Sequence, residues 1–483
     1  MATIMLLCVF VLSFAYVHAV SLKKNISYPY AGIRFRLEPK FLLRLRFVFG
    51  AGSILQDGYS RFKYKPFKVA RNDIDLLVLP AKYIDEIRQY TREQLSGIEA
   101  LAFNVLGRFN RIDILNKSDL HVRVLRNYLT PNMGQVMPNA QDELTYSWQV
   151  DVPKCEDWEE VDIQHVLRWV IGRIYARTFI GYPACRNDDW IQTSLDYTRD
   201  VFGLTFLTHC FPKFLHPLVL LLAPASWRLG RHEKHAYKDG EPYTLLGGML
   251  KDAKGLERDM EEIVLRQVIS SLASIHTSVM TVTYCLLELC RHPEHIEPLR
   301  EEAKECMEKE QDWARHSTER LPKVDSFICE VHRMHPPSML IPQRRVREPF
   351  TLSNGENVPI GTQFGFPLGP ISHDPQIFSD PEKFDGFRYY RKRVAEDLIG
   401  KSSKYMATTP SDEHLAFGHG VQACPGRFFA VNEIKLILVF FLMDYEFKQP
   451  ERQMASPLHF PFEEYLVLNP TLKLMRRRKK HIY

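Results

Sequence analysis

The sequence predicts a mainly α-helical protein with small β-sheets, of the α+β class, and three observations support this. Residues 261–290 contain no proline or glycine and are apolar on most faces, which is typical of a helix that crosses a protein interior. A second apolar helix is expected over residues 427–443, directly after a glycine-rich loop. The turn signal Ser353-Asn354-Gly355 lies between short alternating runs and predicts a hairpin. Helix therefore dominates.

Composition indicates one large folded domain. The chain has 483 residues, of which 45% are hydrophobic and 25% are charged, so extensive disorder is excluded. A length prior alone allows about two to four domains, but large enzymes with one core exceed that prior. The formal net charge of +5 is mild. It does not call for a nucleic-acid partner, although it suits an anionic membrane surface or an acidic protein.

The N-terminal segment, residues 1–20, is expected to be a membrane anchor. Residues 4–20 are mostly apolar, no Lys or Arg precedes them, and several basic residues follow. This asymmetry holds the downstream chain in the cytoplasm. We therefore expect a single span in the endoplasmic reticulum membrane and a cytosolic domain over residues 21–483. A cleaved signal peptide is the alternative, because residues 17–19 form a passable cleavage site.

Further elements follow from periodicity and from breakers. Residues 84–110 and 158–182 have the apolar spacing of amphipathic helices. Residues 202–225 are apolar but too interrupted for a second span; we expect buried core there, with a patch that dips into a membrane surface as the alternative. Residues 326–334 are expected to form a helix that ends at a Pro-Pro pair. Residues 367–395 are expected to be irregular.

Nine cysteines are scattered along the chain, and they form no Cys-x-x-Cys pair. This spacing argues against a zinc site and against a thioredoxin-like motif. We expect reduced thiols in a cytosol-facing protein for all of them except Cys424, which lies in an unusual loop.

That loop, Phe417 to Gly426, is the most informative segment and is called the cysteine loop below. Its glycines let the backbone approach a large flat group. Cys424 stands where a helix begins, with Pro425 in the first turn. Exposed amide N–H groups and the helix dipole at such a position favour the thiolate. A thiolate held in a tight, glycine-lined loop is a metal ligand or a nucleophile.

The loop admits two other interpretations. Gly418-x-Gly420-x-x-Ala423, with Asp444 about twenty residues on, matches the dinucleotide-binding pattern. Its context does not, because the preceding residues make a poor buried strand and too little chain follows for further βαβ units. A plain structural cysteine would explain neither the glycines nor the start of the helix.

The cysteine loop resembles the cysteine-ligand loop of the cytochrome P-450 superfamily, Phe-x-x-Gly-x-Arg/His-x-Cys-x-Gly. Phe417, Gly420, Cys424 and Gly426 match this pattern. Gln422 stands where family members carry Arg or His to pair with a haem propionate. Losing that charge-assisted hydrogen bond is expected to weaken the propionate contact by about 1.5–3 kcal/mol. The resemblance implies that the Cys424 thiolate binds the iron of haem b.

A second family signature, Glu-x-x-Arg, is matched by Glu330 and Arg333, which share one helix face. Arg388 lies in a segment, residues 381–388, that resembles the one whose Arg completes a buried triad in the family. The resemblance implies that Arg388 locks against Glu330 and Arg333. The triad is structural, and it pins the chain that leads into the cysteine loop.

Residues 273–277 resemble the oxygen-binding site of the family, Ala/Gly-Gly-x-Asp/Glu-Thr. Ala273 and Thr277 match, whereas Ser274 replaces the usual Gly and His276 the usual acid. The resemblance implies that Thr277 assists oxygen binding, and His276 is expected to relay protons. The alternative for Thr277 is a hydroxyl that bonds back to its own helix.

Two positions are candidates for pairing with the haem propionates. Arg126 lies where the family's Trp-x-x-x-Arg motif falls, although Val122 replaces the Trp. Arg345, or its neighbour Arg344, lies where another family Arg is expected. The ordinary interpretation of such arginines is a solvated side chain.

The resemblance implies a haem-thiolate monooxygenase that oxidises a lipophilic small molecule with dioxygen. NADPH is expected to act only indirectly, through a partner NADPH–cytochrome P-450 reductase. Within the superfamily the chain is similar to ent-kaurene-oxidase-like and indole-diterpene enzymes of fungal secondary metabolism, which implies a terpenoid or other secondary metabolite as substrate.

Two alternatives remain open. A haem-thiolate isomerase would use Cys424 without external electrons, and the altered Ser274 and His276 would suit it. A degenerate haem-binding protein without enzymatic activity is the other. Gln422 and the stretch from Trp227 to Tyr243, which is shorter than in the family, point to it.

Overall fold

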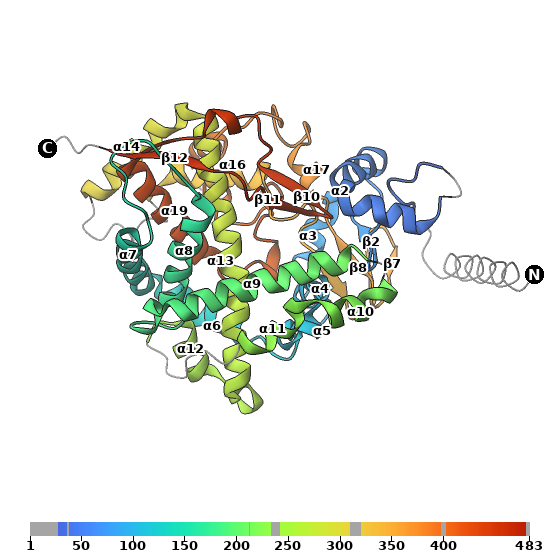
Figure 1. Cartoon of the computed structure of the whole chain (residues 1–483). Coiled ribbons are helices and arrows are strands. Elements are labelled where there is room, and N and C mark those ends of the chain that lie inside the picture. The colour runs from blue at the N-terminus through green and yellow to red at the C-terminus, as the bar shows by residue number, and fades with distance from the viewer. Residues whose placement is uncertain are drawn as a thin grey trace, which may run out of the picture.

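The computed structural model describes residues 28–35, 38–211, 213–232, 242–309, 320–397 and 402–479. The expected membrane anchor over residues 1–20 lies outside these ranges. Within them, helices make up most of the molecule and short strands form small sheets (Figure 1). The predicted α+β class, with helix dominating, is confirmed.

The longer elements keep the labels of Figure 1. The helices are α2 (Lys40–Phe62), α3 (Ile84–Ile87), α4 (Gly97–Asn104), α5 (Gly107–Asn110), α6 (Leu120–Val124), α7 (Met133–Val150), α8 (Ile163–Phe179), α9 (Asp188–His209), α10 (His216–Leu222), α11 (Pro224–His232), α12 (Leu245–Asp252), α13 (Met260–Arg291), α14 (Ile296–Lys309), α16 (Pro322–Met334), α17 (Leu368–Ser372), α18 (Arg388–Asp397) and α19 (Arg427–Asp444). The strands are β1 (Phe67–Ala70), β2 (Asp75–Val78), β3 (Leu95–Ser96), β4 (Glu159–Val161), β5 (Arg344–Val346), β6 (Phe350–Thr351), β7 (Asn357–Val358), β8 (Gln363–Gly365), β9 (Tyr445–Lys448), β10 (His459–Phe462), β11 (Tyr465–Leu468) and β12 (Leu474–Arg478).

The largest sheet has the strand order β1-β2-β8-β5-β3. Strands β2 and β8 are parallel, with Leu77 opposite Phe364, and the other neighbours are antiparallel. β4, β12 and β9 form a second sheet, and β10 pairs with β11. β6 and β7 form the hairpin predicted around residues 353–355, and Gly355 there adopts a φ of 88° that favours glycine.

Helix α13 runs through the middle of the molecule and confirms the helix predicted over residues 261–290 (Figure 1). The Asp259 side chain caps it by accepting from the N–H of Glu261. The helix packs against α8, α9, α16 and α19, and most of its residues are buried. Ala273, His276 and Thr277 are exceptions, because their side chains are exposed in the middle of this buried helix. They therefore face open space rather than packed side chains.

The single amphipathic helix expected over residues 84–110 is wrong. The structure has α3, β3, α4 and α5 there. β3 exists because Leu95 and Ser96 pair with β5, a partner distant in sequence. Leu106 and Arg111 adopt positive φ values of 57° and 63°, which interrupt the helical path although neither is glycine.

Three other predicted helices are confirmed. The helix expected over residues 158–182 is confirmed as α8, although strand β4 occupies its first residues because it pairs with β12. The helix expected over residues 326–334 is confirmed as α16 and begins earlier. The helix over residues 427–443 is confirmed as α19. Residues 367–395 are less irregular than expected, since α17 and most of α18 lie there.

The segment over residues 202–225, expected to be buried core, is buried on one side only. Leu204 and Leu220 are buried. Leu218, Leu221 and Leu222 are instead 52%, 62% and 69% exposed. The expectation of buried core is therefore wrong for these three leucines. Helix α10 lies at the surface, and only some of its apolar side chains can point into the core.

Candidate active site

The cysteine loop folds back on itself before α19 begins. The N–H of Cys424 donates to the carbonyl of Phe417 at 2.8 Å, and the N–H of Ala423 donates to the carbonyl of Gly420 at 3.0 Å. Gly418 and Gly420 have φ values of 76° and 69°, which favour glycine. A Cβ at position 420 would lie 2.1 Å from the carbonyl oxygen of Arg88. Both glycines are therefore required by the path of the loop.

The side chain of Cys424 remains accessible at the end of this tight loop. Burial among the surrounding atoms raises the pKa of the Cys424 thiol, whereas the N–H groups of Gly426 and Arg427 and the charge of Arg427 act in the opposite direction. The effect of the helix start is present as expected, but burial outweighs it. A bound metal cation would supply the charge that stabilises the thiolate here.

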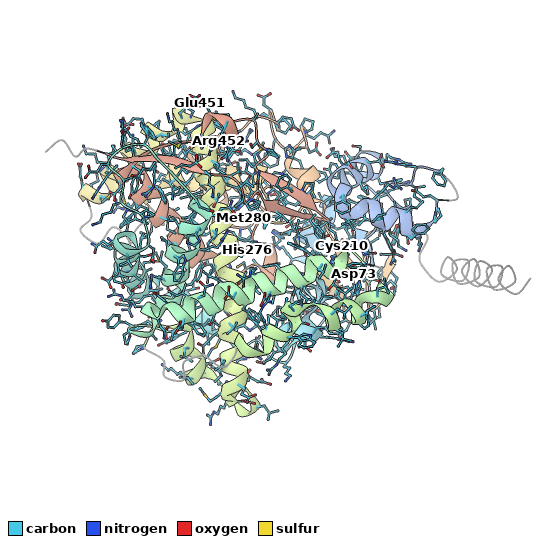
Figure 2. All side chains as sticks on the ribbon, viewed as in Figure 1. Asp73, Cys210, His276, Met280, Glu451 and Arg452 are labelled. Atoms are coloured by element: carbon cyan, nitrogen blue, oxygen red, sulfur yellow. The ribbon has the colours of Figure 1, made fainter. Side chains whose placement is uncertain are left out.

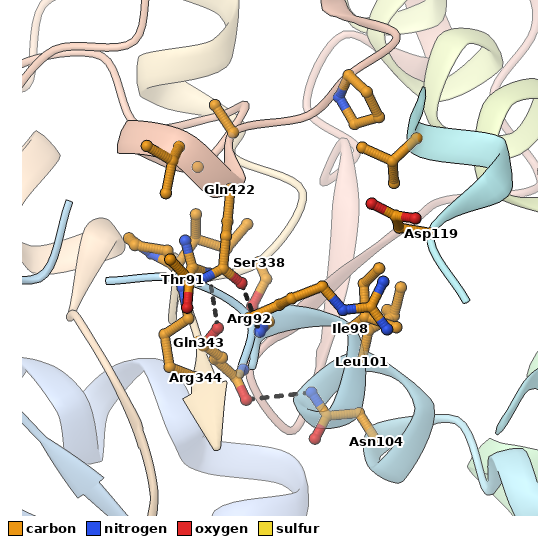
Figure 3. A pocket seen from close by; sticks show the side chains of 18 of the residues that line it. Thr91, Arg92, Ile98, Leu101, Asn104, Asp119, Ser338, Gln343, Arg344 and Gln422 are labelled. Carbon is orange, nitrogen blue, oxygen red and sulfur yellow. Dashed lines mark hydrogen bonds between the residues drawn. The ribbon is translucent and has the colours of Figure 1, made fainter. Parts of the chain in front are cut away.

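The cysteine loop forms one side of a cavity of about 580 Å³, called the cysteine-loop cavity below (Figure 3). Gly418, Val421, Gln422, Ala423 and Pro425 of the loop line it. Much of the remaining wall is apolar, with side chains that come from α4, from α6 and from the chain before β5. These apolar residues are Ile98, Leu101, Val122, Leu340, Ile341 and Pro342. A large, flat and mainly apolar group fits such a space.

Three arginines line the same cavity, namely Arg92, Arg126 and Arg344. Arg126 donates from Nη2 to the carbonyl of Val421, which places it beside the cysteine loop. Its helix begins as α6 and continues as a short π-turn over Leu125–Leu129. Glu93 and Asp119 line the cavity as well, so the three arginines face two carboxylates, and an anionic group is expected at Arg126 and Arg344 beside the cysteine loop rather than throughout the cavity.

Arg344 is the arginine of the predicted pair that faces the cavity. It is buried, donates to the carbonyls of Gln343 at 2.8 Å and His419 at 3.3 Å, and its Nε has no hydrogen-bond partner. Burial lowers the pKa of Arg344 to about 10, and no carboxylate among the described residues opposes this. A buried guanidinium without a carboxylate calls for a bound anion.

Arg345, the neighbour singled out from the sequence, points elsewhere. Its Nε lies 3.3 Å from Glu99, and its guanidinium stacks over Phe103. It does not belong to the lining of the cysteine-loop cavity. The alternation of β5 explains the difference, because Arg344 shares a face with the buried Val346 and Arg345 takes the other face. That alternation was the signal that could have separated the two arginines.

The structure brings Glu330, Arg333 and Arg388 together in a buried cluster. Arg333 makes a bidentate contact with the Glu330 carboxylate at 2.7 and 2.9 Å. The Nε of Arg388 donates to both oxygens of Glu330 at 3.2 Å. Arg388 also donates to the carbonyl of Ser379 at 2.6 Å, and Arg333 to that of Pro381 at 2.7 Å. The cluster thus ties α16 to the irregular chain that precedes α18.

Thr277 and His276, predicted together as catalytic, face different surroundings. The Thr277 hydroxyl donates to the carbonyls of Ala273 at 2.9 Å and Ser274 at 3.1 Å, so it bonds back to its own helix. His276 lines a separate cavity of about 550 Å³ between α8, α9 and α13, where its ring lies 4.9 Å from that of Phe202. Figure 2 marks its place in the middle of α13.

The His276 side chain is accessible from this cavity, but desolvation by the protein around it, together with the charge of Arg168, lowers the pKa of His276 to about 4. His276 is therefore neutral at physiological pH. The cavity that it lines is not the cysteine-loop cavity. Nothing in this geometry joins it to Thr277 in a proton relay. The sequence around His276 does not indicate which of the two cavities its side chain faces.

Sequence reasoning missed Arg92, which lies at the start of the turn before β3 and lines the cysteine-loop cavity. Its Nη2 donates to the carbonyl of Asn116 at 3.2 Å. No motif or spacing marks this arginine. Only the packing of its turn against the cysteine loop places it at the cavity.

Comparison with known proteins gives a consistent result. The family model described as cytochrome P450 matches residues 231–476. The cytochrome P450 monooxygenase AN1598 of Emericella nidulans is 38% identical over 95% of this chain and 89% of its own. The ent-kaurene oxidase P450-4 of Gibberella fujikuroi is 34% identical over 96% of this chain and 95% of its own. The cytochrome P450 monooxygenase paxP of Penicillium paxilli is 33% identical over 95% and 91% respectively.

Among solved structures, the retinoic acid-bound cyanobacterial CYP120A1 has a similar fold. The TM-score is 0.66, and the match covers 94% of this chain and 100% of that one. Sequence identity is 18%, so this likeness concerns the fold alone.

Proposed function

Because the chain belongs to the cytochrome P450 family, we propose that it oxidises a terpenoid or a similar lipophilic secondary metabolite with electrons from NADPH–cytochrome P450 reductase. Its relatives are fungal enzymes of secondary metabolism, as predicted. The chain is accordingly a haem-thiolate monooxygenase. The identity of the substrate and the source of the electrons are the parts of the proposal that need experiment.

The observation that carries the proposal is that one cavity is lined both by Arg344 and by Ala423 and Pro425, the two chain neighbours of the accessible Cys424. Cys424 offers a thiol at the end of a glycine-lined loop, and Arg344 offers a buried guanidinium whose Nε lacks a partner. Haem b has an iron that accepts a thiolate and propionates that accept guanidinium hydrogen bonds. The residues around the cavity therefore fit haem.

We assign Cys424 to the iron, and Phe417, Gly420 and Gly426 to the shape of the loop around it. Arg126 and Arg344 are assigned to the propionates, and Arg344 takes the role first considered for Arg345. When bound, haem supplies the activation of dioxygen for insertion of one oxygen atom into the substrate. The chain's own side chains hold haem, orient the substrate and exclude water from the mainly apolar cavity.

Thr277 is assigned to proton handling at the middle turn of α13. Its hydroxyl already donates to two backbone carbonyls, so it is held in place and still has lone pairs that accept a hydrogen bond. His276 is not included in this assignment, because it lines the other cavity. No observation on the described residues favours an isomerase over an oxygenase.

A terpenoid substrate is supported by the relatives and by the cavity wall. Three relatives, from Gibberella fujikuroi, Fusarium fujikuroi and Gibberella intermedia, are named ent-kaurene oxidases, and much of the wall of the cysteine-loop cavity is aliphatic. Aliphatic walls bind a hydrocarbon skeleton through burial of apolar area, worth about 25 cal/mol per Å². The arginines of the lining are assigned to the haem propionates, so recognition of the substrate skeleton by the aliphatic part of the wall is expected to be by shape.

We propose that one face of the catalytic domain, residues 21–483, lies on the endoplasmic reticulum membrane, behind a single N-terminal span. An apolar patch supports this: Leu218, Leu221 and Leu222 of α10, with Trp227 of α11, are exposed by 52% to 70%. Exposed apolar patches of this kind mark interaction or membrane surfaces. Among the described residues, α13 alone has the length and hydropathy of a span, and 78% of that stretch is buried within the protein.

The proposal is tested with microsomes that contain the chain or its Cys424→Ala variant. A red-shifted absorption band of the reduced, CO-bound protein, absent in the variant, is expected. Turnover of terpenoids is then measured with NADPH and with or without the reductase. Product only with both supports the proposal. Product without either would indicate an isomerase, and no band from a folded protein would contradict the haem assignment.

A further inference from the structure

Gln422 stands where the family pattern has Arg or His, yet its side chain is fully engaged elsewhere. Its Nε2 donates to the carbonyls of Tyr90 at 2.9 Å and Leu95 at 2.7 Å. Its Oε1 accepts from the N–H of Gly97 at 2.9 Å. Two N–H groups and the carbonyl oxygen of the amide are all used. Figure 3 shows Gln422 beside Thr91 and Arg92 on the wall of the cysteine-loop cavity.

The three partners are backbone groups that need a partner from outside their own segment. Gly97 is the first residue of α4, so its N–H has no partner within the helix. Ser96 caps the same helix but accepts from the N–H of Glu99, which leaves Gly97 to Gln422. The segment Tyr90–Gly97 therefore depends on this one amide for three hydrogen bonds.

The cysteine loop holds the preceding residues in the same way. The N–H of Val421 donates to the carbonyl of Arg88 at 2.9 Å, and the His419 ring lies 3.1 Å from Asp85. The fit is close, because a Cβ at position 97 would lie 2.9 Å from Nη1 of Arg344 and 3.3 Å from Oε1 of Gln422. Glycine at position 97 is thus part of the same arrangement.

We infer that Gln422 is a positioning residue, which clamps the segment Tyr90–Gly97 against the cysteine loop and so forms one wall of the haem pocket. Thr91, Arg92 and Glu93 of the clamped segment line the cavity. Gln422 thus does not merely lack the charge that family members use there. It fixes the segment that carries Arg92, and the positive charge of the cavity comes from the arginines around it.

Neither family side chain could replace it. Arg has five donors and no acceptor, so the N–H of Gly97 would lose its partner and face a cation. Neutral His has one donor and one acceptor, which cannot satisfy two carbonyls and an N–H together. Glu keeps the shape and accepts from Gly97, but its carboxylate faces the carbonyl oxygens of Tyr90 and Leu95. Restoring the family residue is therefore expected to damage this chain.

Hydrogen–deuterium exchange of the full-length protein tests the clamp, with Gln422→Ala, Gln422→Glu and Gln422→Arg. Peptides that cover residues 90–97 are expected to exchange about tenfold faster or more in each variant, as the loss of one or two net hydrogen bonds implies. Gln149→Ala removes the same atoms from an exposed site on α7 and is the control. Should Gln422→Ala not fold, Gln422→Glu carries the test.

Haem retained per protein after purification is the second readout, and here the inference rests on the proposed haem site. All three variants are expected to retain less haem than the unaltered protein and the control. If Gln422→Arg retains as much or more, and exchanges over residues 90–97 as the unaltered protein does, the clamp is overturned. Failure of the unaltered protein to bind haem would contradict the proposed function, whereas the exchange result would still decide on the clamp.

Discussion

The Nε of Arg388 lies 3.2 Å from both carboxylate oxygens of Glu330, a residue 58 positions earlier in the chain. Both side chains are buried, and Arg333 holds the same carboxylate from within α16. Arg388 leads into α18 and Glu330 belongs to α16. One carboxylate therefore joins the helix to the chain that runs towards the cysteine loop.

Substitution of Arg388 by Ala is expected to destabilise the fold severely. It would leave the buried Glu330 carboxylate with one arginine instead of two and several carbonyls without a donor, a loss of about 3–5 kcal/mol. Chemical unfolding followed by circular dichroism measures the change. Arg391→Ala is the matched control, because Arg391 pairs with Asp385 at the surface, where such a pair contributes about 0–1 kcal/mol. Equal losses for the two variants would refute the buried role.

Arg344→Gln is expected to weaken haem retention much more than Arg345→Gln. The first change removes a charge that faces the cavity, which corresponds to about 1.5–3 kcal/mol, or roughly 10- to 150-fold in affinity. The second removes a side chain that pairs with Glu99 outside the cavity. Competition for haem with an apo-globin acceptor measures both losses. The reverse order would restore the assignment first made from the sequence.

This pair of arginines shows where sequence reasoning stops. Cys424, Glu330, Arg333 and Arg388 could be predicted because each belongs to a motif whose residues meet within a loop, a helix turn or a triad. The choice between Arg344 and Arg345 depends on the face that a short strand turns to the cavity. The alternation of β5 carries that information, but only once the strand itself is known.

Some elements of the fold could likewise be predicted from the sequence, and others could not. Helices α13 and α19 were predictable because long apolar stretches without breakers leave few alternatives. The region 84–110 was not, because two-residue β3 exists only through its pairing with β5. The role of Gln422 was equally hidden, since its partners Tyr90 and Leu95 lie 332 and 327 positions away and offer backbone atoms only.

Thr277→Ala and His276→Ala are expected to differ in how well NADPH consumption is coupled to product. Loss of the Thr277 hydroxyl removes a hydrogen-bonding group that assists proton delivery at the middle turn of α13, so coupling should fall about tenfold or more. His276 lines the cavity between α8 and α9, and its removal should leave coupling nearly unchanged. NADPH oxidation and product formation are measured together. Strong uncoupling by His276→Ala would reinstate it as a proton relay.

Stability is expected to decrease as pH rises through neutrality, owing to His209. Its ring lies 2.8 Å from the Glu463 carboxylate, and both side chains are buried. Burial by itself lowers the pKa of His209, but hydrogen bonding and charge attraction to Glu463 outweigh it and raise the pKa above its usual 6.5. Asp73 adds to this effect and Arg71 opposes it. The folded state therefore binds a proton more tightly than the unfolded state. The stabilisation is complete below pH 6.5 and is lost as pH rises through the raised pKa.

Unfolding by guanidinium between pH 5.5 and 9 tests this, with His209→Gln as the comparison. The variant keeps a donor for Glu463 but cannot titrate. The unaltered protein should lose stability more steeply above pH 6.5 than the variant does. Parallel curves would show that His209 does not bind the proton.

The exposed patch of α10 is expected to bind membranes without the N-terminal anchor. A chain that begins after residue 27 should still associate with vesicles, because Leu221 and Leu222 are 62% and 69% exposed on one helix. Full burial of a leucine side chain in an apolar medium is worth about 1.5–3 kcal/mol. Changing both to Ser should therefore weaken vesicle binding by roughly 100-fold or more, as measured by flotation.

Leu256→Ser is the control, since Leu256 is 93% exposed but lies between α12 and α13, outside the patch. Unchanged flotation of the double variant would mean that this patch lies against something other than lipid.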